Sequence, residues 1–149
     1  KLPFEVLLPQ EFLVKKLKKL PRHAVSISKK IQEYKLLGHC TEKTGAQLSQ
    51  ELWQDVFEAF GLSLELITVG CCGMAGTYGH ETDHFEESRG IYNLSWSKKI
   101  PKDPLLQQNI LVSGFSCRSQ VKRFEGFRPL HPLQALLREI ISVNSFKNE

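Results

Sequence analysis

Short runs of branched apolar residues alternate along this chain with longer segments of helical periodicity. The runs predict strands at residues 4–8, 34–37, 64–69 and 109–113. The periodic segments predict helices at residues 10–20, 46–60, 84–96 and 118–124, and a last helix that begins at residues 131–132. Strands that alternate with helices are typical of an α/β domain with a mostly parallel sheet. We therefore predict a single α/β domain over residues 1–149, with about four strands flanked by helices.

The segment 46–60 has the strongest helical pattern in the chain. Its apolar stripe consists of Leu48, Leu52, Val56 and Phe60, widened by Trp53 and Phe57. Gly61 follows directly, as a glycine often does after the last turn of a helix. We expect Trp53, Phe57 and Phe60 to belong to the core.

The charge pattern does not indicate a nucleic-acid partner. The net charge is only +4, from 20 lysines and arginines against 16 acidic residues. A nucleic-acid-binding face would concentrate positive charge and interleave it with aromatic residues. The lysine clusters are Lys15, Lys16, Lys18 and Lys19, followed by Lys29 and Lys30. We interpret them as solvated helix faces.

The composition also indicates where such a chain works. No apolar run approaches the ~18–20 residues that span a bilayer, so no transmembrane segment is expected. Four cysteines, two of them adjacent, suit a reducing compartment and a metal or redox role better than a disulfide framework. We expect a cytoplasmic protein, free or peripheral to the inner membrane. Because Lys1 lies so close to the first expected strand, we also expect this chain to be a piece of a longer polypeptide.

Each cysteine follows an expected strand. Cys40 comes after the second strand, Cys71 and Cys72 after the third, and Cys117 after the fourth. In a parallel sheet the carboxyl ends of the strands lie at one edge, so we expect the four thiols to gather there. Four thiolates can satisfy an iron–sulfur cluster or a zinc ion.

The adjacent pair is surrounded by glycines at every third position, which are Gly70, Gly73, Gly76 and Gly79. Adjacent cysteines are poor disulfide partners, but a sharp backbone turn directs both sulfurs into one site. Glycine permits such a turn, and it lets main-chain N–H groups approach a ligand closely. N–H groups aimed at sulfur tune the reduction potential of a cluster.

Four ordered segments carry a family resemblance: Gly38-His39-Cys40, Gly70-Cys71-Cys72-Gly73-Met74-Ala75-Gly76-Thr77-Tyr78-Gly79, Ser116-Cys117-Arg118-Ser119-Gln120 and His131-Pro132-Leu133. Together they resemble the cysteine-rich CCG domain of heterodisulfide-reductase-type proteins. More narrowly, they resemble the C-terminal CCG domain of bacterial FAD-linked oxidases of the D-lactate or D-2-hydroxyglutarate dehydrogenase type. The resemblance covers residues 34 to about 137, and the glycine-rich segment is its specific part.

The resemblance implies an iron–sulfur electron-transfer domain. Its cluster ligands would be Cys40, Cys71, Cys72 and Cys117, and the residues around them would be His39, Gly73, Gly76, Arg118 and Gln120. A flavin domain with FAD would oxidise a 2-hydroxy acid, and a ferredoxin-like segment of the same polypeptide would carry further clusters. The electron acceptor and the individual substrate stay open. The resemblance implies no dehydrogenase activity for this chain alone.

The sequence departs from the wider CCG family at Gln120, where that family has a second cysteine of a Cys-x-x-Cys motif. The missing cysteine leaves at most one four-thiolate site. The departure at Gln120 is shared with the FAD-linked oxidase branch, which the sequence resembles in having Cys-Arg-x-Gln. The alternative from another class is a non-redox cysteine domain that holds structural zinc or serves as a docking module.

Two histidine motifs have competing interpretations. Residues 80–84 read His-Glu-Thr-Asp-His and fit the H-E-x-x-H pattern of zinc hydrolases, but they stand at a loop-to-helix junction, where we interpret the acidic residues as favouring a helix start. His39 would either tune a cluster or be satisfied by a backbone partner at the end of its strand. We interpret His131 as a residue at the start of the last helix.

Overall fold

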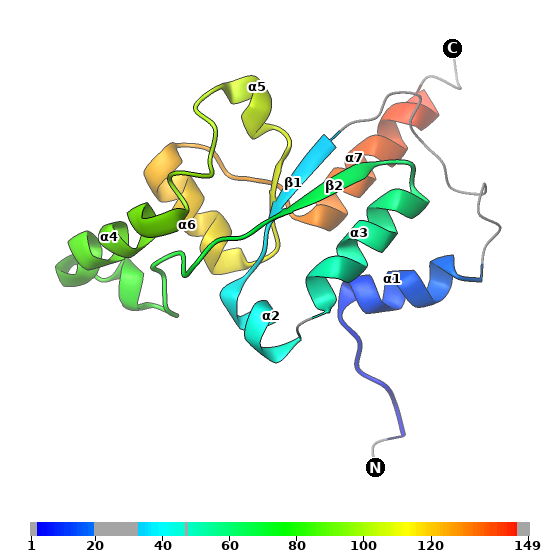
Figure 1. The fold of residues 1–149 in the computed structure, drawn as a ribbon, viewed down its shortest axis with the longest axis horizontal. Coiled ribbons are helices and arrows are strands. Elements are labelled where there is room, and N and C mark those ends of the chain that lie inside the picture. The colour runs from blue at the N-terminus through cyan, green and yellow to red at the C-terminus, as the bar shows by residue number, and fades with distance from the viewer. Residues whose placement is uncertain (1–2, 20–32, 47, 146–149) are drawn as a thin grey trace.

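The computed structural model describes residues 3–19, 33–46 and 48–145, with side chains to residue 142 in the last helix. Its three strands are β1 (Glu33–Leu37), β2 (Ser63–Ile67) and β3 (Ile110–Val112), which form a parallel sheet in the order β2-β1-β3 (Figure 1). The helices are α1 (Pro9–Leu17), α2 (Cys40–Gly45), α3 (Ser49–Ala59), α4 (Phe85–Ser95), α5 (Pro104–Gln107), α6 (Phe115–Glu125) and α7 (Pro132–Ser145). Two short 3₁₀ helices, η1 (Tyr78–His80) and η2 (Thr82–His84), precede α4. The predicted α/β fold with a parallel sheet is confirmed.

The sheet has a hydrophobic layer on each face, because successive side chains of a strand point to opposite sides. On one face, side chains of β1, β2 and β3 pack against α3 and α7, and α1 covers α3. This layer includes Tyr34, Leu36, Leu64, Leu111, Trp53, Val56, Phe57 and Leu136. On the other face, α4 and α6 pack against Leu37, Ile110 and Val112. The result is a three-layer arrangement of helices, sheet and helices (Figure 1).

The strand order places β1 at the centre and creates a switch in chain direction. The connection from β1 to β2 runs through α3 on one face, and the connection from β2 to β3 runs through α4 on the other. The first connection thus runs from β1 to its neighbour β2, and the second crosses back over β1 to β3, with the same hand. In α/β sheets this geometry opens a crevice at the carboxyl ends of the two strands where the direction reverses. Here those strands are β1 and β3.

The strand expected at residues 4–8 is wrong. This segment has no strand partner and leads into α1, which begins at Pro9. Phe4 and Val6 are 62% and 79% exposed. A run of apolar residues resembles a buried strand, but these side chains find no sheet face to cover. The sheet of the described residues therefore has three strands where we expected about four.

The other expected elements are confirmed with shifted ends. The helix expected at residues 46–60 begins only at Ser49, because the separate helix α2 occupies the chain from Cys40 to Gly45. The expected core residues Trp53, Phe57 and Phe60 are buried. The helix expected at residues 10–20 ends at Leu17, and its expected end at residues 20–21 lies outside the described residues.

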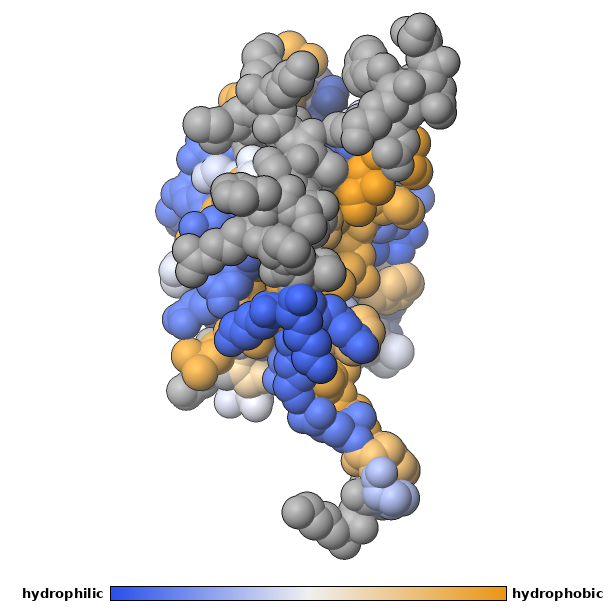
Figure 2. All heavy atoms as spheres, turned by 90° about the vertical axis from the view of Figure 1, so that its right-hand side faces the viewer, coloured by the Kyte–Doolittle hydropathy of each residue, from blue (hydrophilic) through white to orange (hydrophobic). Residues whose placement is uncertain are grey.

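The lysines of the first cluster lie on the surface, as expected. Lys15, Lys16, Lys18 and Lys19 are exposed, and hydrophilic side chains of α1 cover part of the face that Figure 2 shows. Lys29 and Lys30 lie outside the described residues. Within the described part of the chain, none of the helices combines the length and the apolar character that crossing a membrane would require.

Candidate functional site

The four cysteines stand where the three strands deliver the chain to one edge of the sheet. Cys40 opens α2 shortly after β1, and Cys117 lies in the first turn of α6 shortly after β3. Cys71 and Cys72 belong to the loop that follows β2. Two of the three segments thus flank the switch point between β1 and β3, and the loop from β2 reaches toward them.

The thiols come together as two neighbouring pairs. Cys117 lies close enough to Cys72 to shift its pKa, and Cys40 lies close enough to Cys71 to contribute to its raised pKa. Cys40 is also close enough to Cys117 to interact with it electrostatically. All four cysteines are free thiols. The sequence prediction that they gather at one edge of the sheet agrees with this geometry.

Burial divides the four thiols into an inner and an outer pair. Cys72 and Cys117 are 3% and 1% exposed, whereas Cys71 is exposed and Cys40 is half-buried. The neighbouring Cys117 thiol favours the Cys72 thiolate, so the pKa of Cys72 is lowered and the pKa of Cys117 is raised. Burial is the main cause of the raised pKa of Cys71. The inner pair is therefore more stable with one negative charge than with two.

The glycine-rich loop turns sharply and points N–H groups at the sulfurs. Gly73 has φ +82°, a left-handed conformation that residues with a Cβ rarely adopt, and its N–H lies 3.3 Å from Cys71 Sγ. The N–H of Met74 is directed at the sulfur of Cys72, which favours its thiolate. At Gly79 a Cβ would lie 2.6 Å from the carbonyl oxygen of Gly73, so the loop closes tightly on itself.

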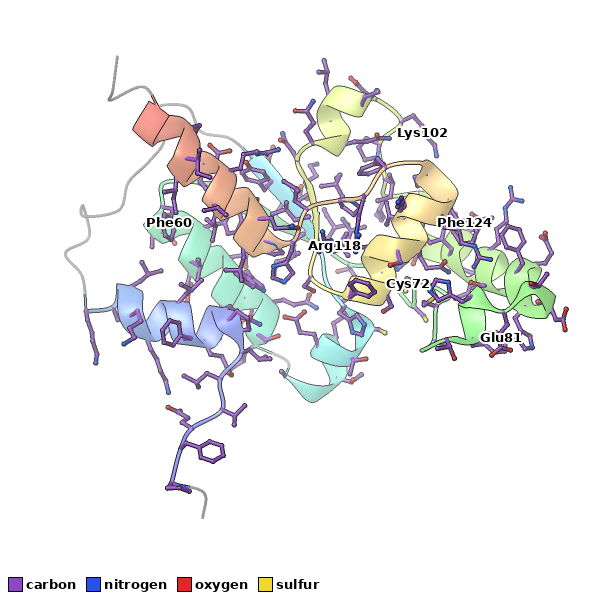
Figure 3. The ribbon with its side chains drawn as sticks, turned by 180° about the vertical axis from the view of Figure 1, so that it is seen from behind. Phe60, Cys72, Glu81, Lys102, Arg118 and Phe124 are labelled. Atoms are coloured by element: carbon purple, nitrogen blue, oxygen red, sulfur yellow. The ribbon has the colours of Figure 1, made fainter. Side chains whose placement is uncertain are left out.

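A buried polar clamp holds this loop between α4 and α6. Gln120, which is fully buried, donates from Nε2 to the carbonyl oxygen of Cys72 at 3.0 Å and to Ser88 Oγ at 2.7 Å. Ser88 Oγ donates in turn to the carbonyl oxygen of Gly73 at 2.7 Å. Figure 3 shows Cys72 beside α6, the helix that carries Gln120. Gln120 Oε1 is buried and has no hydrogen-bond partner.

A second polar network fixes the segment that carries Cys40. His39 caps α2 by accepting from the Thr41 N–H at its Nδ1, 3.1 Å away, and its own N–H donates to Ser113 Oγ at 3.1 Å. Ser113 Oγ donates to Glu42 Oε2 at 2.7 Å, which ties α2 to the end of β3. Lys43 Nζ donates to the carbonyl oxygen of Val69 at 2.6 Å, which ties α2 to the chain just before Cys71.

The His39 ring also packs directly beside Cys117. A Cβ on Gly114 would lie 2.0 Å from the ring of His39 and 3.1 Å from Cys117 Sγ, so only a glycine leaves room for both. His39 Nε2 lies 3.4 Å from Ser116 Oγ. The interpretation of His39 as a histidine with a backbone partner at a strand end is therefore confirmed, and the ring adjoins the thiols as well.

The other residues singled out in the sequence take different places. Arg118 extends from α6 toward the start of α7 (Figure 3), where it donates to the carbonyl oxygen of Pro129 and to Gln134 Oε1. His131 accepts from the Leu133 N–H at its Nδ1, so its role at the start of α7 is confirmed. Gly76 has φ +72°, and a Cβ there would meet no atom within 4 Å. It permits the turn without touching a sulfur.

The segment with the H-E-x-x-H pattern does not form the helix that a zinc hydrolase needs. Residues 80–84 are divided between η1 and η2, and His84 Nδ1 lies 2.9 Å from Glu81 Oε2. Tyr78 stacks on the ring of His84 at 3.8 Å. In Figure 3 Glu81 lies at the periphery, away from Cys72. Acidic Glu86 and Glu87 occupy the first turn of α4, as expected.

The donor set fits a group that binds soft sulfur ligands. Four thiols and several N–H donors converge, and thiolates are the ligands that iron–sulfur clusters and zinc prefer. Within the described residues, however, no three His, Cys, Asp or Glu side chains are grouped to hold one metal ion. A single zinc ion needs four ligands in one coordination sphere. In a two-iron cluster two thiolates bind each iron, so two neighbouring pairs of thiols match such a cluster better than a single ion.

Sequence patterns do not identify four residues that position the site, which are Ser88, Glu42, Lys43 and Ser113. Each acts through a contact with a residue far away in the chain, and none stands in a motif. The start of α2 immediately at Cys40 was also missed, because its six residues are too few to show a helical period.

Comparison with known proteins finds relatives among long bacterial enzymes. The chain is 49% identical over 137 residues to the D-2-hydroxyglutarate dehydrogenase of Pantoea ananatis, and 47% identical over 138 residues to that of Escherichia coli. The matches cover 92% and 93% of this chain but only 13% of each relative. The corresponding enzyme of Pseudomonas putida is 43% identical over 134 residues. No family model and no solved structure matches the chain. This chain is therefore homologous to a short segment of these dehydrogenases.

Proposed function

We propose that this chain is the iron–sulfur, electron-transferring segment of an FAD-linked dehydrogenase that oxidises a 2-hydroxy acid. The observation that carries the proposal is the convergence of Cys40, Cys71, Cys72 and Cys117 from the ends of three separate strands. The name that the relatives share adds the substrate class, with D-2-hydroxyglutarate as the first candidate. FAD and the oxidation of the substrate belong to the part of the enzyme outside this segment.

In this proposal the four thiolates hold one cluster, which accepts and passes on single electrons when it is bound. The inner thiols, Cys72 and Cys117, lie on the buried side, where the packed side chains of α4 and α6 exclude water. The outer thiols, Cys71 and Cys40, lie on the solvent side, where a partner can approach.

The surrounding groups of this chain set the charge at the site. The N–H groups of Gly73 and Met74 point at Cys71 and Cys72 and stabilise negative charge on sulfur. Gln120 and Ser88 hold these N–H groups in place, because they fix the carbonyl groups of the same loop. His39 packs beside Cys117 and limits the space on that side. Gly76 permits the turn of the loop, and Arg118 holds the start of α7 through its hydrogen bonds.

Metal analysis of anaerobically purified protein tests this function. We expect iron and acid-labile sulfide in equal amounts, broad visible absorbance that bleaches on reduction, and loss of both in Cys71→Ser and Cys117→Ser variants. A Thr77→Ala variant in the same loop is the control, because Thr77 is exposed and carries no thiol. Zinc without iron in the complete gene product, or unchanged iron content in the Cys117→Ser variant, would overturn the proposal.

A further inference from the structure

A basic and apolar surface patch lies beside the thiol site. It consists of Phe115 and Arg118 on α6, Arg128 on the connection to α7, and Leu133, Gln134 and Leu137 on α7, and we call it the Phe115 patch. Arg128 lies over the ring of Phe115 at 5.3 Å, and Arg118 donates to Gln134 Oε1 at 2.8 Å. Leu133 and Leu137 stand one helical turn apart and flank Gln134. The six residues thus form one continuous surface.

The two arginines of the patch have no carboxylate partner among the described residues. Lys15, Lys35, Lys102 and Arg138 each pair with a glutamate, whereas other basic residues of the described chain, such as Arg89 and Lys122, form no ion pair either. What distinguishes Arg118 and Arg128 is that they lie next to each other beside exposed apolar side chains. Arg118 binds a carbonyl and an amide oxygen, and Arg128 lies on an aromatic ring. The two guanidinium groups are close enough for their repulsion to contribute, after burial, to a lowered pKa of Arg118. Two uncompensated positive charges attract an acidic surface.

The patch also exposes more apolar area than a solvated surface requires. Phe115 is 72% exposed, Leu137 56% and Leu133 39%. Aromatic residues and arginine are enriched in protein interfaces, and interface hot spots are often such residues. An exposed phenylalanine under an arginine is therefore typical of a protein-binding surface, and the flanking leucines extend its apolar centre.

The position of the patch connects it with the thiols. Phe115 opens the helix that carries Cys117, and Arg118 is the residue that follows Cys117. Ser116, between Phe115 and Cys117, faces His39 beside the same sulfur. A protein that covers Phe115 therefore comes close to the thiol site. Proximity of this kind is what transfer of an electron between two proteins requires.

We propose that the Phe115 patch is the docking surface for the flavin-bearing part of the dehydrogenase, which presents carboxylates around an apolar centre. This inference rests on the proposed function. The occupant is assigned from two observations: the uncompensated charge of Arg118 and Arg128, and the length of the relatives, of which this segment covers only 13%. Most of each relative therefore lies outside this segment, and we assign the cover of the patch to that part.

Hydroxyl-radical footprinting of the complete gene product tests whether the patch is covered. Leu137 and Leu106 are both 56% exposed in this chain, and Phe115 at 72% is comparable with Phe4 at 62%, so each pair compares side chains of one type. If the patch is docked, Leu137 and Phe115 should be oxidised at least threefold more slowly than Leu106 and Phe4. Equal rates within each matched pair would overturn the proposal, whether or not the protein contains iron.

Charge reversal tests whether the docked surface serves electron transfer. In the complete gene product, an Arg128→Glu variant should slow reduction of the cluster by the 2-hydroxy acid at least tenfold at low salt. Flavin reduction and cluster reduction by dithionite should stay unchanged. The control is Arg89→Glu on α4, which makes the same charge change at an exposed position away from the patch. Unchanged electron transfer in the Arg128→Glu variant would overturn the proposal.

The two proposals fail in different ways. A gene product without iron, but with slow oxidation of Leu137, would overturn the electron-transfer function and leave the docking surface standing as a contact between domains. A gene product with iron and with a freely oxidised patch would overturn the docking surface alone.

Discussion

Replacing Gln120 separates the role of its amide from the role of its volume. The side chain is fully buried, and its Nε2 donates to the Cys72 carbonyl oxygen and to Ser88 Oγ. A Gln120→Leu variant keeps a similar volume but removes both hydrogen bonds. A Gln120→Glu variant keeps the shape and removes the donor, and it places a carboxylate where the amide was. The two variants therefore differ mainly in charge.

The expected costs follow from the groups that lose partners. In the leucine variant the buried Cys72 carbonyl loses its Gln120 donor, at a cost of ~1–3 kcal/mol. The variant also removes the unpartnered Gln120 Oε1, which offsets part of that cost. We expect a net loss of about 1–2 kcal/mol in the free energy of unfolding. The glutamate variant buries an ionised group beside an acceptor, so we expect a loss of more than about 3 kcal/mol at neutral pH.

The pH dependence of the glutamate variant gives a further check. Burial raises the pKa of a carboxyl group above its unfolded value of about 4.3, so the folded state binds the proton more tightly. Stability of this variant should therefore fall as the pH rises through that range and recover as the pH falls, because the protonated acid donates a hydrogen bond again. The leucine variant should show no such added dependence.

Chemical denaturation of the reduced, metal-free chain measures both variants. The reasoning is refuted if Gln120→Leu is as stable as the parent, or if Gln120→Glu and Gln120→Leu lose the same free energy at neutral pH. Either result would mean that the amide does not hold the cysteine loop.

Three further predictions concern the loop and the core. Gly73→Ala should prevent normal folding of the cysteine loop, because its Cβ would lie 2.2 Å from the carbonyl oxygen of Ser88. Gly76→Ala should lower the free energy of unfolding by only ~1–2 kcal/mol, because only its positive φ is unfavourable for alanine. Thermal unfolding compares the two variants. Tyr34 has its pKa raised from 10.0 to about 12, chiefly by burial, so stability should fall as the pH rises from 10 to 12, and a Tyr34→Phe variant should lose this part of the pH profile. Trp53→Ala, at a residue 1% exposed, should cost ~3–5 kcal/mol in urea unfolding; a loss below that of a surface substitution would contradict its place in the core.

The sequence predicted the fold class and the meeting of the thiols for one physical reason. Parallel strands end at one edge of a sheet, so residues that follow different strands become neighbours whatever their distance along the chain. Cys40, Cys71 and Cys117 illustrate this, because each follows a strand that was identified correctly. The helical periodicity of α3 and the glycines around Cys71 were also predictable, because both are patterns in the local sequence.

The failures have a physical reason too. Residues 4–8 have the composition of a buried strand, but burial depends on a partner face that no local pattern reveals. The contacts of Gln120 with Ser88 and of Glu42 with Ser113 join distant segments, and a serine carries no sequence signal for such a partner. Elements were therefore predictable, while the polar clamps that position the thiols were not.

The distribution of the cysteines over three strand ends controls when the site can exist. During synthesis, Cys40 and then Cys71 and Cys72 appear well before β3, and Cys117 comes only after that last strand. Until β3 takes its place beside β1, the inner pair lacks one of its two thiols. In the proposed function, a cluster offered earlier would meet an incomplete set of ligands and bind weakly. The order of the segments along the chain would then restrict loading of the cluster to chains whose sheet is complete.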